Sequence, residues 1–572
     1  MKTLRYFLTI AVCAILMASC GYPDHLKTLP KETVAVVSFD LAGMAAKGDL
    51  DQLQNAEFYK KLQAKMGEKD AETAKQTDEF MKNPLNYGIN FLEPVYLFVT
   101  YKGAGEDPNV GLSIALGDAD KFKTFITKVL KAEENGYAIE TATGYNYLKT
   151  PEASFGWSEG TLIVLPAISK DSLNDPTKVF ASIFAEKEDG GSVVDMPGFK
   201  SYYKKSQDIS GWISMDVIAT IMDAAKEFSP DLADDPTLKN YNEQMEKLKG
   251  SSFQFHVTFN DDEIYTEYIT DLPSDLQKMY SDEILRAGVP SKMSDLIKST
   301  DLGVVSMSLN LKNYLKLMSD NPAFDDKTNE TMKQYVAAAQ QFTAPFDGDL
   351  LITLADVRVT EKTVTEQVPV SKVAEDDNLY ASADDYEFDW DVEYQDTTYT
   401  KSVTTPIFLA ATTVNDESFG FLGLMLGDDK PKVDKLTTTS LGDYEIYTTI
   451  KDKMLVVGND KASIEAIVGG TYKGNNDCAM AKGAASHGVY VYANLDMTQY
   501  PKAVQDVIDE SDDTEETAAA KKLFGIFDKI EMYNKENYTA VVSVKLKPNG
   551  HNSLYTLIEQ FGNIAYDMSE SK

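Results

Sequence analysis

Four segments of the chain begin with an apolar, strand-like run, and each run ends at an Asp or Asn that introduces apolar residues at helical spacing. The four segments are residues 34–45, 211–222, 304–315 and 489–500, and their polar residues are Asp40, Asp216, Asn310 and Asp496. An Asp or Asn at the start of a helix accepts hydrogen bonds from the free N–H groups of the first turn. The pattern therefore predicts four N-caps rather than a catalytic cluster, and Gln499 completes a capping-box pattern with Asp496.

The order of these units repeats along the chain, because the first and third segments and the second and fourth are separated by nearly equal lengths. Three further pairs of segments keep the same order. Residues 95–122 match 407–433 in pattern, residues 161–165 match 454–458, and residues 253–272 match 528–546. We interpret the chain as two similar halves, residues 30–287 and residues 288–572.

Helical spacing of apolar residues dominates between the strand-like segments. The helical stretches are residues 51–82, 235–249, 312–342, 498–527 and 552–566. Strands mostly occur as hairpins, and helices occur singly between sheet segments. This favours an α+β fold with mostly antiparallel sheets and packed helices over a doubly wound parallel sheet.

The second half contains extra residues at 357–404, where two strand-like runs flank a polar turn and predict a long β-hairpin extension. Within it, acidic residues alternate with aromatic residues or Val. On a strand, one face would carry Glu387, Asp389, Asp391 and Glu393, and the other face would carry Trp390 with its apolar neighbours.

Two interpretations of this acidic strand differ in what covers each face. Adjacent carboxylates can bind Ca²⁺, the one cofactor that the sequence suggests, if other oxygens complete the site; a solvated acidic face is the alternative, which we favour. The apolar face packs either on the body of the second half or on a partner. We favour the body, because most large apolar faces belong to a core.

The N-terminus has the pattern of a secretory signal. Lys2 and Arg5 precede an apolar run, and the small residues Ala18 and Ser19 precede Cys20. This arrangement resembles the lipobox of bacterial lipoproteins. The resemblance implies that residues 1–19 are removed as a signal peptide, that Cys20 is lipidated, and that residues 20–29 tether the protein to a membrane.

The segment TLPKETVAVVSFDLAGMA, which follows this motif closely, resembles the start of a family of Bacteroidota lipoproteins with a domain of unknown function. The resemblance implies a lipid-anchored outer-membrane protein and no particular activity. The sequence GYPDH after Cys20 lacks the acidic run that resembles a surface-export tag. We therefore expect the periplasmic side rather than the cell surface.

Charge and cysteine content exclude several other classes. The formal net charge of −35 argues against nucleic acid as a partner and against lying flat on an anionic leaflet. Once Cys13 is removed with the signal and Cys20 is lipidated, only Cys478 is left, so we expect no intramolecular disulfide. We do not expect Cys478 to be catalytic, because the sequence around it predicts no activating group.

Evidence for an enzyme is weak. GWSEG around Ser158 matches the pattern of esterase nucleophiles, but the strand-like TLIVLP follows it and predicts a hairpin turn. The four histidines have no spacing typical of a metal site, so we expect no metal site of that kind.

The working hypothesis is a non-enzymatic, lipid-anchored envelope protein that binds or scaffolds another envelope protein or a glycan. The alternatives are a serine hydrolase that uses Ser158 and a carbohydrate-binding surface lipoprotein, the latter suggested by the 31 tyrosines.

Overall fold

The computed structural model describes residues 22–53, 55–61, 79–80, 83–103, 108–130, 132–167, 175–185, 191–217, 248–274, 277, 284–319, 326–369, 394–415, 431–441, 444–502, 504–506, 515–535 and 538–570. The predicted signal peptide, Cys20 and the acidic strand with Glu387, Asp389, Trp390, Asp391 and Glu393 lie outside the described residues.

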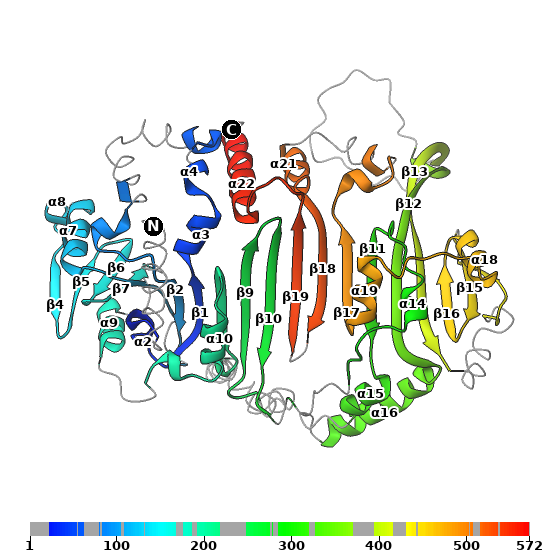
Figure 1. The fold of residues 1–572 in the computed structure, drawn as a ribbon, viewed down its shortest axis with the longest axis horizontal. Helices are drawn as coiled ribbons and strands as arrows, with labels where there is room; N and C mark the ends of the chain where they lie inside the picture. Colours follow the sequence, from blue (N-terminus) through cyan, green and yellow to red (C-terminus); the bar gives the residue numbers. More distant parts are fainter. Residues whose placement is uncertain are drawn as a thin grey trace, which may run out of the picture.

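The described residues form one sheet of 19 strands (Figure 1). The strands are β1 (Thr33–Phe39), β2 (Val95–Thr100), β3 (Asn109–Ala115), β4 (Ile139–Ala142), β5 (Tyr145–Lys149), β6 (Ala153–Trp157), β7 (Thr161–Pro166), β8 (Ile209–Ser214), β9 (Ser252–Asn260), β10 (Glu263–Asp271), β11 (Gly303–Ser308), β12 (Phe346–Pro369), β13 (Tyr394–Val414), β14 (Thr437–Leu441), β15 (Tyr444–Lys451), β16 (Met454–Gly458), β17 (Val489–Asn494), β18 (Phe527–Lys535) and β19 (Thr539–Leu546).

Helices connect and cover these strands. The α-helices are α2 (Asp24–Lys27), α3 (Leu41–Lys47), α4 (Leu50–Leu53), α7 (Ala119–Val129), α8 (Ala132–Asn135), α9 (Pro176–Phe184), α10 (Phe199–Lys205), α14 (Ser291–Ser294), α15 (Leu311–Ser319), α16 (Asp326–Thr343), α18 (Lys461–Val468), α19 (Ala479–Ser486), α21 (Glu515–Phe524) and α22 (Ser553–Glu570). Short 3-10 helices are η1 (Pro84–Tyr87), η2 (Val193–Asp195) and η6 (Met497–Gln499). The mixed helix and sheet content agrees with the sequence prediction.

Every pairing between these strands is antiparallel, and the pairings place them in the order β4-β5-β6-β7-β3-β2-β1-β8-β9-β10-β19-β18-β17-β11-β12-β13-β16-β15-β14. The pair β10–β19 lies in the middle and joins the earlier strands to the later ones. Figure 1 shows these two strands side by side at the centre of the molecule.

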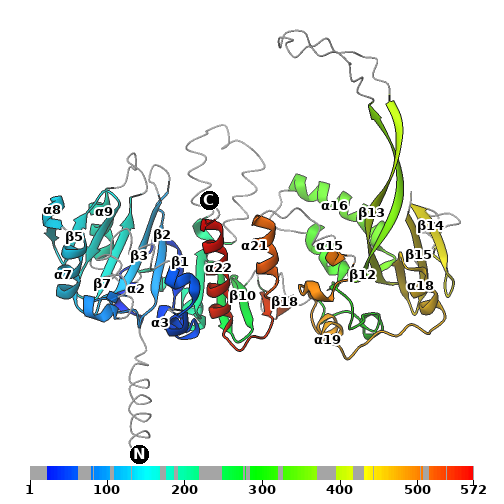
Figure 2. The same ribbon diagram turned by 90° about the horizontal axis from the view of Figure 1, so that it is seen from above.

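β12 and β13 form a ribbon that is much longer than the hairpin of β2 and β3. Their pairing runs without a further bulge from Val357 and Pro406 out to Pro369 and Tyr394. Figure 2 shows this ribbon projecting from the body. The tip, residues 370–393, lies outside the described residues.

One matched pair from the sequence differs in the structure. Residues 407–414 belong to β13, which lies between β12 and β16, whereas residues 95–100 form β2, which lies between β1 and β3. By its place in the strand order, β13 corresponds to β3, and β12 corresponds to β2. The match of 95–122 with 407–433 is therefore shifted by one strand.

Three of the four predicted caps are confirmed. Asp40 accepts a hydrogen bond from the N–H of Gly43 at 3.0 Å, Asn310 from the N–H of Asn313 at 3.2 Å, and Asp496 from the N–H of Thr498 at 3.1 Å. Asp216 accepts a hydrogen bond from the N–H of Gly250, just before β9, at 2.8 Å. The residues that its cap would bind, 218 and 219, lie outside the described residues.

The predicted capping box at Asp496 takes another form. The side-chain amide of Gln499 donates to the Asp496 carboxylate at 3.2 Å. The backbone N–H of Asp496, which a capping box would use, donates instead to the Asn494 side-chain oxygen at 2.9 Å. The side chain of Asn494, the last residue of β17, therefore accepts the hydrogen bond that a capping box would assign to Gln499.

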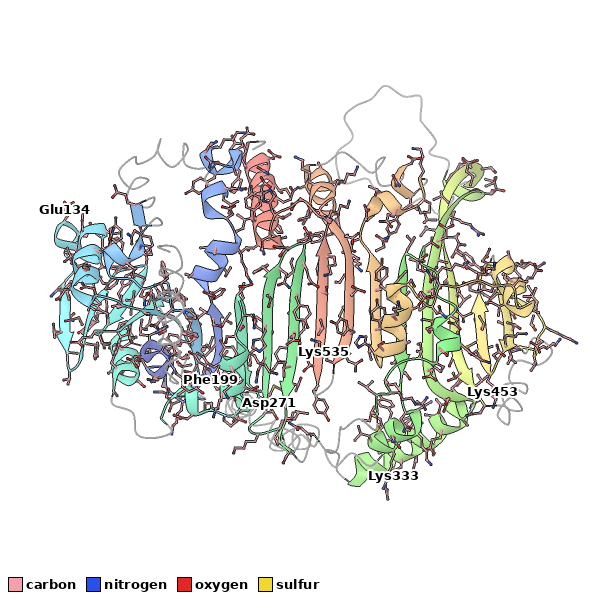
Figure 3. The ribbon with its side chains drawn as sticks, viewed as in Figure 1. Glu134, Phe199, Asp271, Lys333, Lys453 and Lys535 are labelled. Carbon is pink, nitrogen blue, oxygen red and sulfur yellow. The ribbon has the colours of Figure 1, made fainter. Side chains whose placement is uncertain are left out.

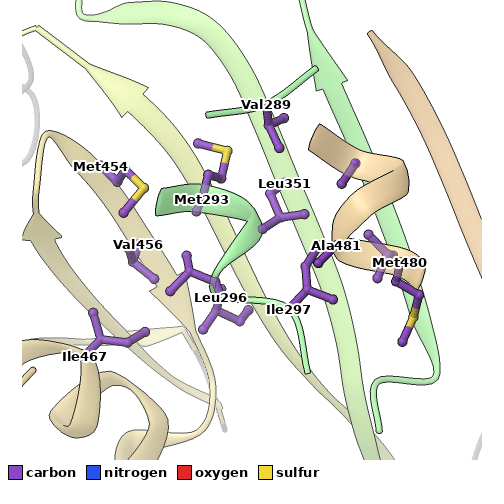
Figure 4. Packing of buried hydrophobic residues seen from close by; sticks show 14 of the residues in the cluster. Val289, Met293, Leu296, Ile297, Leu351, Met454, Val456, Ile467, Met480 and Ala481 are labelled. Atoms are coloured by element: carbon purple, nitrogen blue, oxygen red, sulfur yellow. The ribbon is translucent and has the colours of Figure 1, made fainter. Parts of the chain in front are cut away.

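Two of the three hydrophobic core clusters lie on the same face of the sheet, under helices. In the earlier strands, α2 and α10 pack on β1, β2 and β8 through a cluster that includes Leu26, Phe199 and Trp212. In the later strands, α14, α18 and α19 pack on β11, β12, β13, β16 and β17, and Figure 4 shows Met293, Leu351 and Ala481 in that cluster. We call this the helix-covered face. The third cluster lies on the other face, where α7 packs on β6 and β7 through residues that include Phe122, Trp157 and Leu162.

Candidate functional site

The opposite face of the sheet carries a row of aliphatic, aromatic and methionine side chains that one threonine interrupts. Residues paired directly across antiparallel strands lie on the same face, so the register defines the row. From β16 to β2 it consists of Val457, Ala410, Ile352, Val305, Val491, Met532, Val542, Thr266, Val257, Ile209, Phe39 and Val95. No charged residue occurs in it. We call the face that carries this row the open face.

The middle of the row is exposed. Ile352, Val305 and Met532 are 40, 42 and 43% exposed. Tyr268 and Ile213 lie on the same face, since side chains two residues apart on a strand share a face, and both are exposed. A contiguous exposed apolar patch on a protein surface usually marks a site of interaction.

In β11 and β12, the contrast between neighbours on one strand shows that one face is exposed and the other is buried. Val304 and Leu351 point to the helix-covered face and are 1 and 0% exposed, whereas Val305 and Ile352 follow them in sequence and are exposed. Both sets are aliphatic. Burial under α14, α18 and α19 explains the first set, and no described helix buries the second to that degree. Farther along the row, Thr266 and Val95 are buried.

The backbone under this patch offers nothing to a ligand. β12, β11, β17, β18 and β19 each have a paired strand on both sides at the row. Their N–H and C=O groups are therefore used within the sheet. The open face can contribute apolar contact and almost no hydrogen bonding.

α15, α16 and the ribbon stand beside the open face. Figure 2 shows them on one side of the sheet, with α18 and α19 on the other. α15 follows β11 through the Asn310 cap, and α16 leads into β12, so this helical hairpin connects two strands of the row. α15 and α16 pack mainly against each other.

The central strands carry charged groups on the face opposite the row. Glu267 lies 2.6 Å from Lys535, which Figure 3 labels, and Glu263 lies 2.8 Å from Lys545. Both ion pairs connect β10 with β18 or β19. Burial alone would raise the pKa of Glu267, but its hydrogen bonds with Lys535 and Tyr265 outweigh burial and lower it. The pairs tie the sheet together across its middle.

Asp301, just before β11, is a buried carboxyl with an unusual environment. One carboxylate oxygen accepts a hydrogen bond from the N–H of Lys298 at 2.8 Å. The other has no hydrogen-bond partner among the described residues. Burial raises the pKa of Asp301 to about 6. This group belongs to the core around α14 and does not reach the open face.

Residues considered for chemistry in the sequence are not brought together. The N–H of Ser158 donates to the carbonyl of Thr161 at 2.9 Å in the β6–β7 turn, so the predicted hairpin turn is confirmed. This is not the strand-to-helix turn that a serine nucleophile of this motif needs. Cys478 caps α19 by accepting a weak hydrogen bond from the N–H of Ala481 at 3.4 Å.

The histidines are separated and serve local contacts. His25 lies 2.9 Å from the carbonyl of Pro94, His256 lies 3.0 Å from the Ser210 hydroxyl, and His487 lies 3.0 Å from the carbonyl of Asn534. Within the described ranges, no group of three or more His, Cys, Asp or Glu residues could hold a metal ion. None of the helices described there is both long and apolar enough to cross a membrane.

Sequence reasoning missed the open face, although a signal was present. VVSMS in β11 and LLITL in β12 place apolar residues on both faces of the strand. A strand with one wet face shows strict alternation instead. Apolar residues on both faces indicate that something covers the second face as well.

The fold places the chain among mixed helix and sheet proteins built on one wide antiparallel sheet. Residues 26–384 match the family model DUF4836, a domain of unknown function. This match covers more than half of the chain, and the chain therefore belongs to the DUF4836 family.

No curated protein matches the chain. Among solved structures, one similar chain is described as crystal form I of TP0453. It shares 11% identity, the similarity covers 44% of this chain and 81% of that chain, and the TM-score is 0.23. A similarity at this level carries no argument about function.

Proposed function

We propose that this protein is a non-enzymatic, lipid-anchored binding protein of the cell envelope and that the open face is its binding surface. The observation that carries the proposal is the exposure of Ile352, Val305 and Met532 in an uncharged row. Burying each of these side chains is favourable by about 1.5–3 kcal/mol relative to leaving it in contact with water. A ligand on this face recovers it.

The lipobox pattern at Cys20 supports anchoring to the outer membrane, with the periplasmic side favoured. In that setting the body is held near lipid and near other envelope components. Ser158 in its hairpin turn gives no support to hydrolysis. The exposed centre of the row is aliphatic, so it favours an apolar ligand over a glycan.

We also infer that residues 30–287 and 288–572 are two halves related by duplication. The order β3-β2-β1-β8-β9-β10 on one side of the central pair corresponds to β13-β12-β11-β17-β18-β19 on the other. The two halves then meet through equivalent strands, β10 and β19, and the row crosses both.

Binding of a neutral dye that brightens in apolar surroundings tests the proposed surface. The test uses the Cys20→Ser protein, which cannot carry an attached lipid at that residue. We expect the dye to bind, and Val305→Asp and Ile352→Asp to reduce its binding strongly. Leu92→Asp is the matched control, because Leu92 is exposed and outside the sheet. Equal dye binding by all four proteins would contradict the proposal.

A further inference from the structure

We propose that the ligand of the open face is the acyl chain of a single lipid molecule, lying across the strands along the row from Ile352 to Val542. This inference rests on the proposed function and names the class of ligand for the same surface. It follows from the apolar side chains of the face, from the lack of free hydrogen-bonding groups there and from the alignment of the row.

The chemistry of the face suits hydrocarbon. Ile352, Val305, Val491, Met532 and Val542 are aliphatic or thioether side chains on five adjacent strands. The backbone beneath them is fully engaged in the sheet. An acyl chain needs no hydrogen bonds, and all of its surface is apolar.

A protein partner fits this patch poorly. Interfaces between proteins carry about one hydrogen bond per 100–200 Å² and take most of their binding energy from Trp, Tyr and Arg, with Val and Leu under-represented. The five residues from Ile352 to Val542 include none of those three types, although Tyr268 on the same face is exposed. A second copy of this chain would also bring a second formal charge of −35.

The alignment of the row matches a linear ligand. Neighbouring strands lie about 4.8 Å apart, so the five residues span roughly 19 Å in a straight path across the sheet. Each one contacts the ligand at regular intervals. The path crosses the strands where Val305 and Met532 are exposed, and no charged side chain interrupts it.

α15, which stands beside the open face, adds apolar residues near this path. Leu311, Tyr314, Leu315 and Met318 have the spacing of one helix face, and none of them is fully buried. The helix is joined to β11 at one end and through α16 to β12 at the other. The connections of α15 therefore bring these apolar residues near the strands of Val305 and Ile352.

A single lipid is a better occupant than a bilayer surface. The formal charge of −35 opposes approach to an anionic leaflet. A single lipid that has left the membrane avoids this charge repulsion, because it brings only one headgroup.

The experiment measures equilibrium binding of radiolabelled palmitate below its micelle concentration to the Cys20→Ser protein. We expect saturable binding that Val305→Asp and Met532→Asp each weaken by about tenfold or more. Leu92→Asp should bind as the parent does. Val305→Thr, which keeps the shape of valine, checks the site in a protein whose fold is least disturbed, and we expect it to weaken binding measurably.

Absence of palmitate binding by the parent, or equal binding by the Val305 and Met532 variants, would overturn the acyl-chain assignment. In that case loss of dye binding in Val305→Asp and Ile352→Asp would leave the proposed binding surface standing. A third result is possible: the protein floats with phosphatidylglycerol vesicles, Val305→Asp abolishes this flotation, and dispersed palmitate does not bind. The occupant is then a bilayer, and this inference is wrong.

Discussion

Asp301 is a single residue whose ionisation should be visible in the stability of the whole protein. Burial raises its pKa to about 6 from the ordinary value of 3.8. The folded state therefore binds this proton more tightly than the unfolded state does. The resulting stabilisation is fully present below pH 3.8 and is lost as the pH rises through about 6.

We expect Asp301→Asn to remove this pH dependence. The asparagine side chain is uncharged and keeps an oxygen for the N–H of Lys298. The free energy of unfolding of the variant, relative to that of the parent, should rise by about 1–3 kcal/mol between pH 4 and pH 7.5. This magnitude follows from a shift of about two pKa units. Urea unfolding of both proteins at the two pH values measures it. A difference between the proteins that does not change with pH would contradict the assignment.

Val304 and Val305 give a matched test of the two faces. Val304→Thr places a hydroxyl in the core under α14 and α19, which should cost about 1–3 kcal/mol in the free energy of unfolding. Val305→Thr places the same hydroxyl on the open face and should change it by no more than about 0.5 kcal/mol. Chemical unfolding of the two variants compares them directly. Equal losses would mean that the open face is covered in solution.

At the residue scale, the sequence predicts the cap residues well and the apolar row not at all. Asp40 and Asn310 bind N–H groups three residues away, and such local contacts can be read from local sequence. Val305 belongs to the row because Ile352 and Val491 lie beside it. Those neighbours are distant in sequence, and only the register of the folded sheet brings them together.

At the scale of elements, the sequence predicts hairpins correctly, but it can match a segment to the neighbouring strand position. The segments 253–272 and 528–546 are both hairpins, β9–β10 and β18–β19, as predicted. The segment 407–414 was matched to β2 and corresponds to β3 by strand order. Both strands are apolar on both faces, so their residue pattern does not distinguish neighbouring positions in a sheet.

The ribbon is the element whose removal should leave the body intact. Only residues 101–108 lie between β2 and β3, which by strand order correspond to the base of β12 and β13. Replacing residues 357–404 with a short glycine-containing turn should therefore change the melting temperature by no more than about 2–3 °C. Calorimetry of this variant and of one lacking only residues 370–393 measures the effect.

The same two deletions test where the apolar side of the predicted acidic strand packs. The part of the ribbon next to the tip is open to solvent, since Asp396, Thr397, Thr398, Tyr399 and Thr400 are all exposed. If the tip packed on the body, as the sequence favours, both deletions would lower the melting temperature by well over this range. If it binds a partner, both deletions should leave stability unchanged and abolish that binding.

At the scale of the whole molecule, the continuity of the sheet through β10 and β19 decides how the chain unfolds. These two strands pair over seven residues, from Glu263 with Lys545 to Ile269 with Thr539, and ion pairs reinforce the junction. A sheet that is unbroken there should make the two halves unfold together. We therefore expect one calorimetric transition for the parent protein.

Val542→Pro should separate the halves. Val542 lies in the middle of β19, where strands pair on both sides. Proline there removes a ladder hydrogen bond and leaves the partner group unsatisfied, which should cost about 1–3 kcal/mol at the junction. Each half keeps its own core under its own helices. The variant should therefore show two calorimetric transitions, and Val542→Thr should show one. Two transitions in the parent would mean that the halves already fold independently and that the row from Ile352 to Val542 ends at a mobile joint.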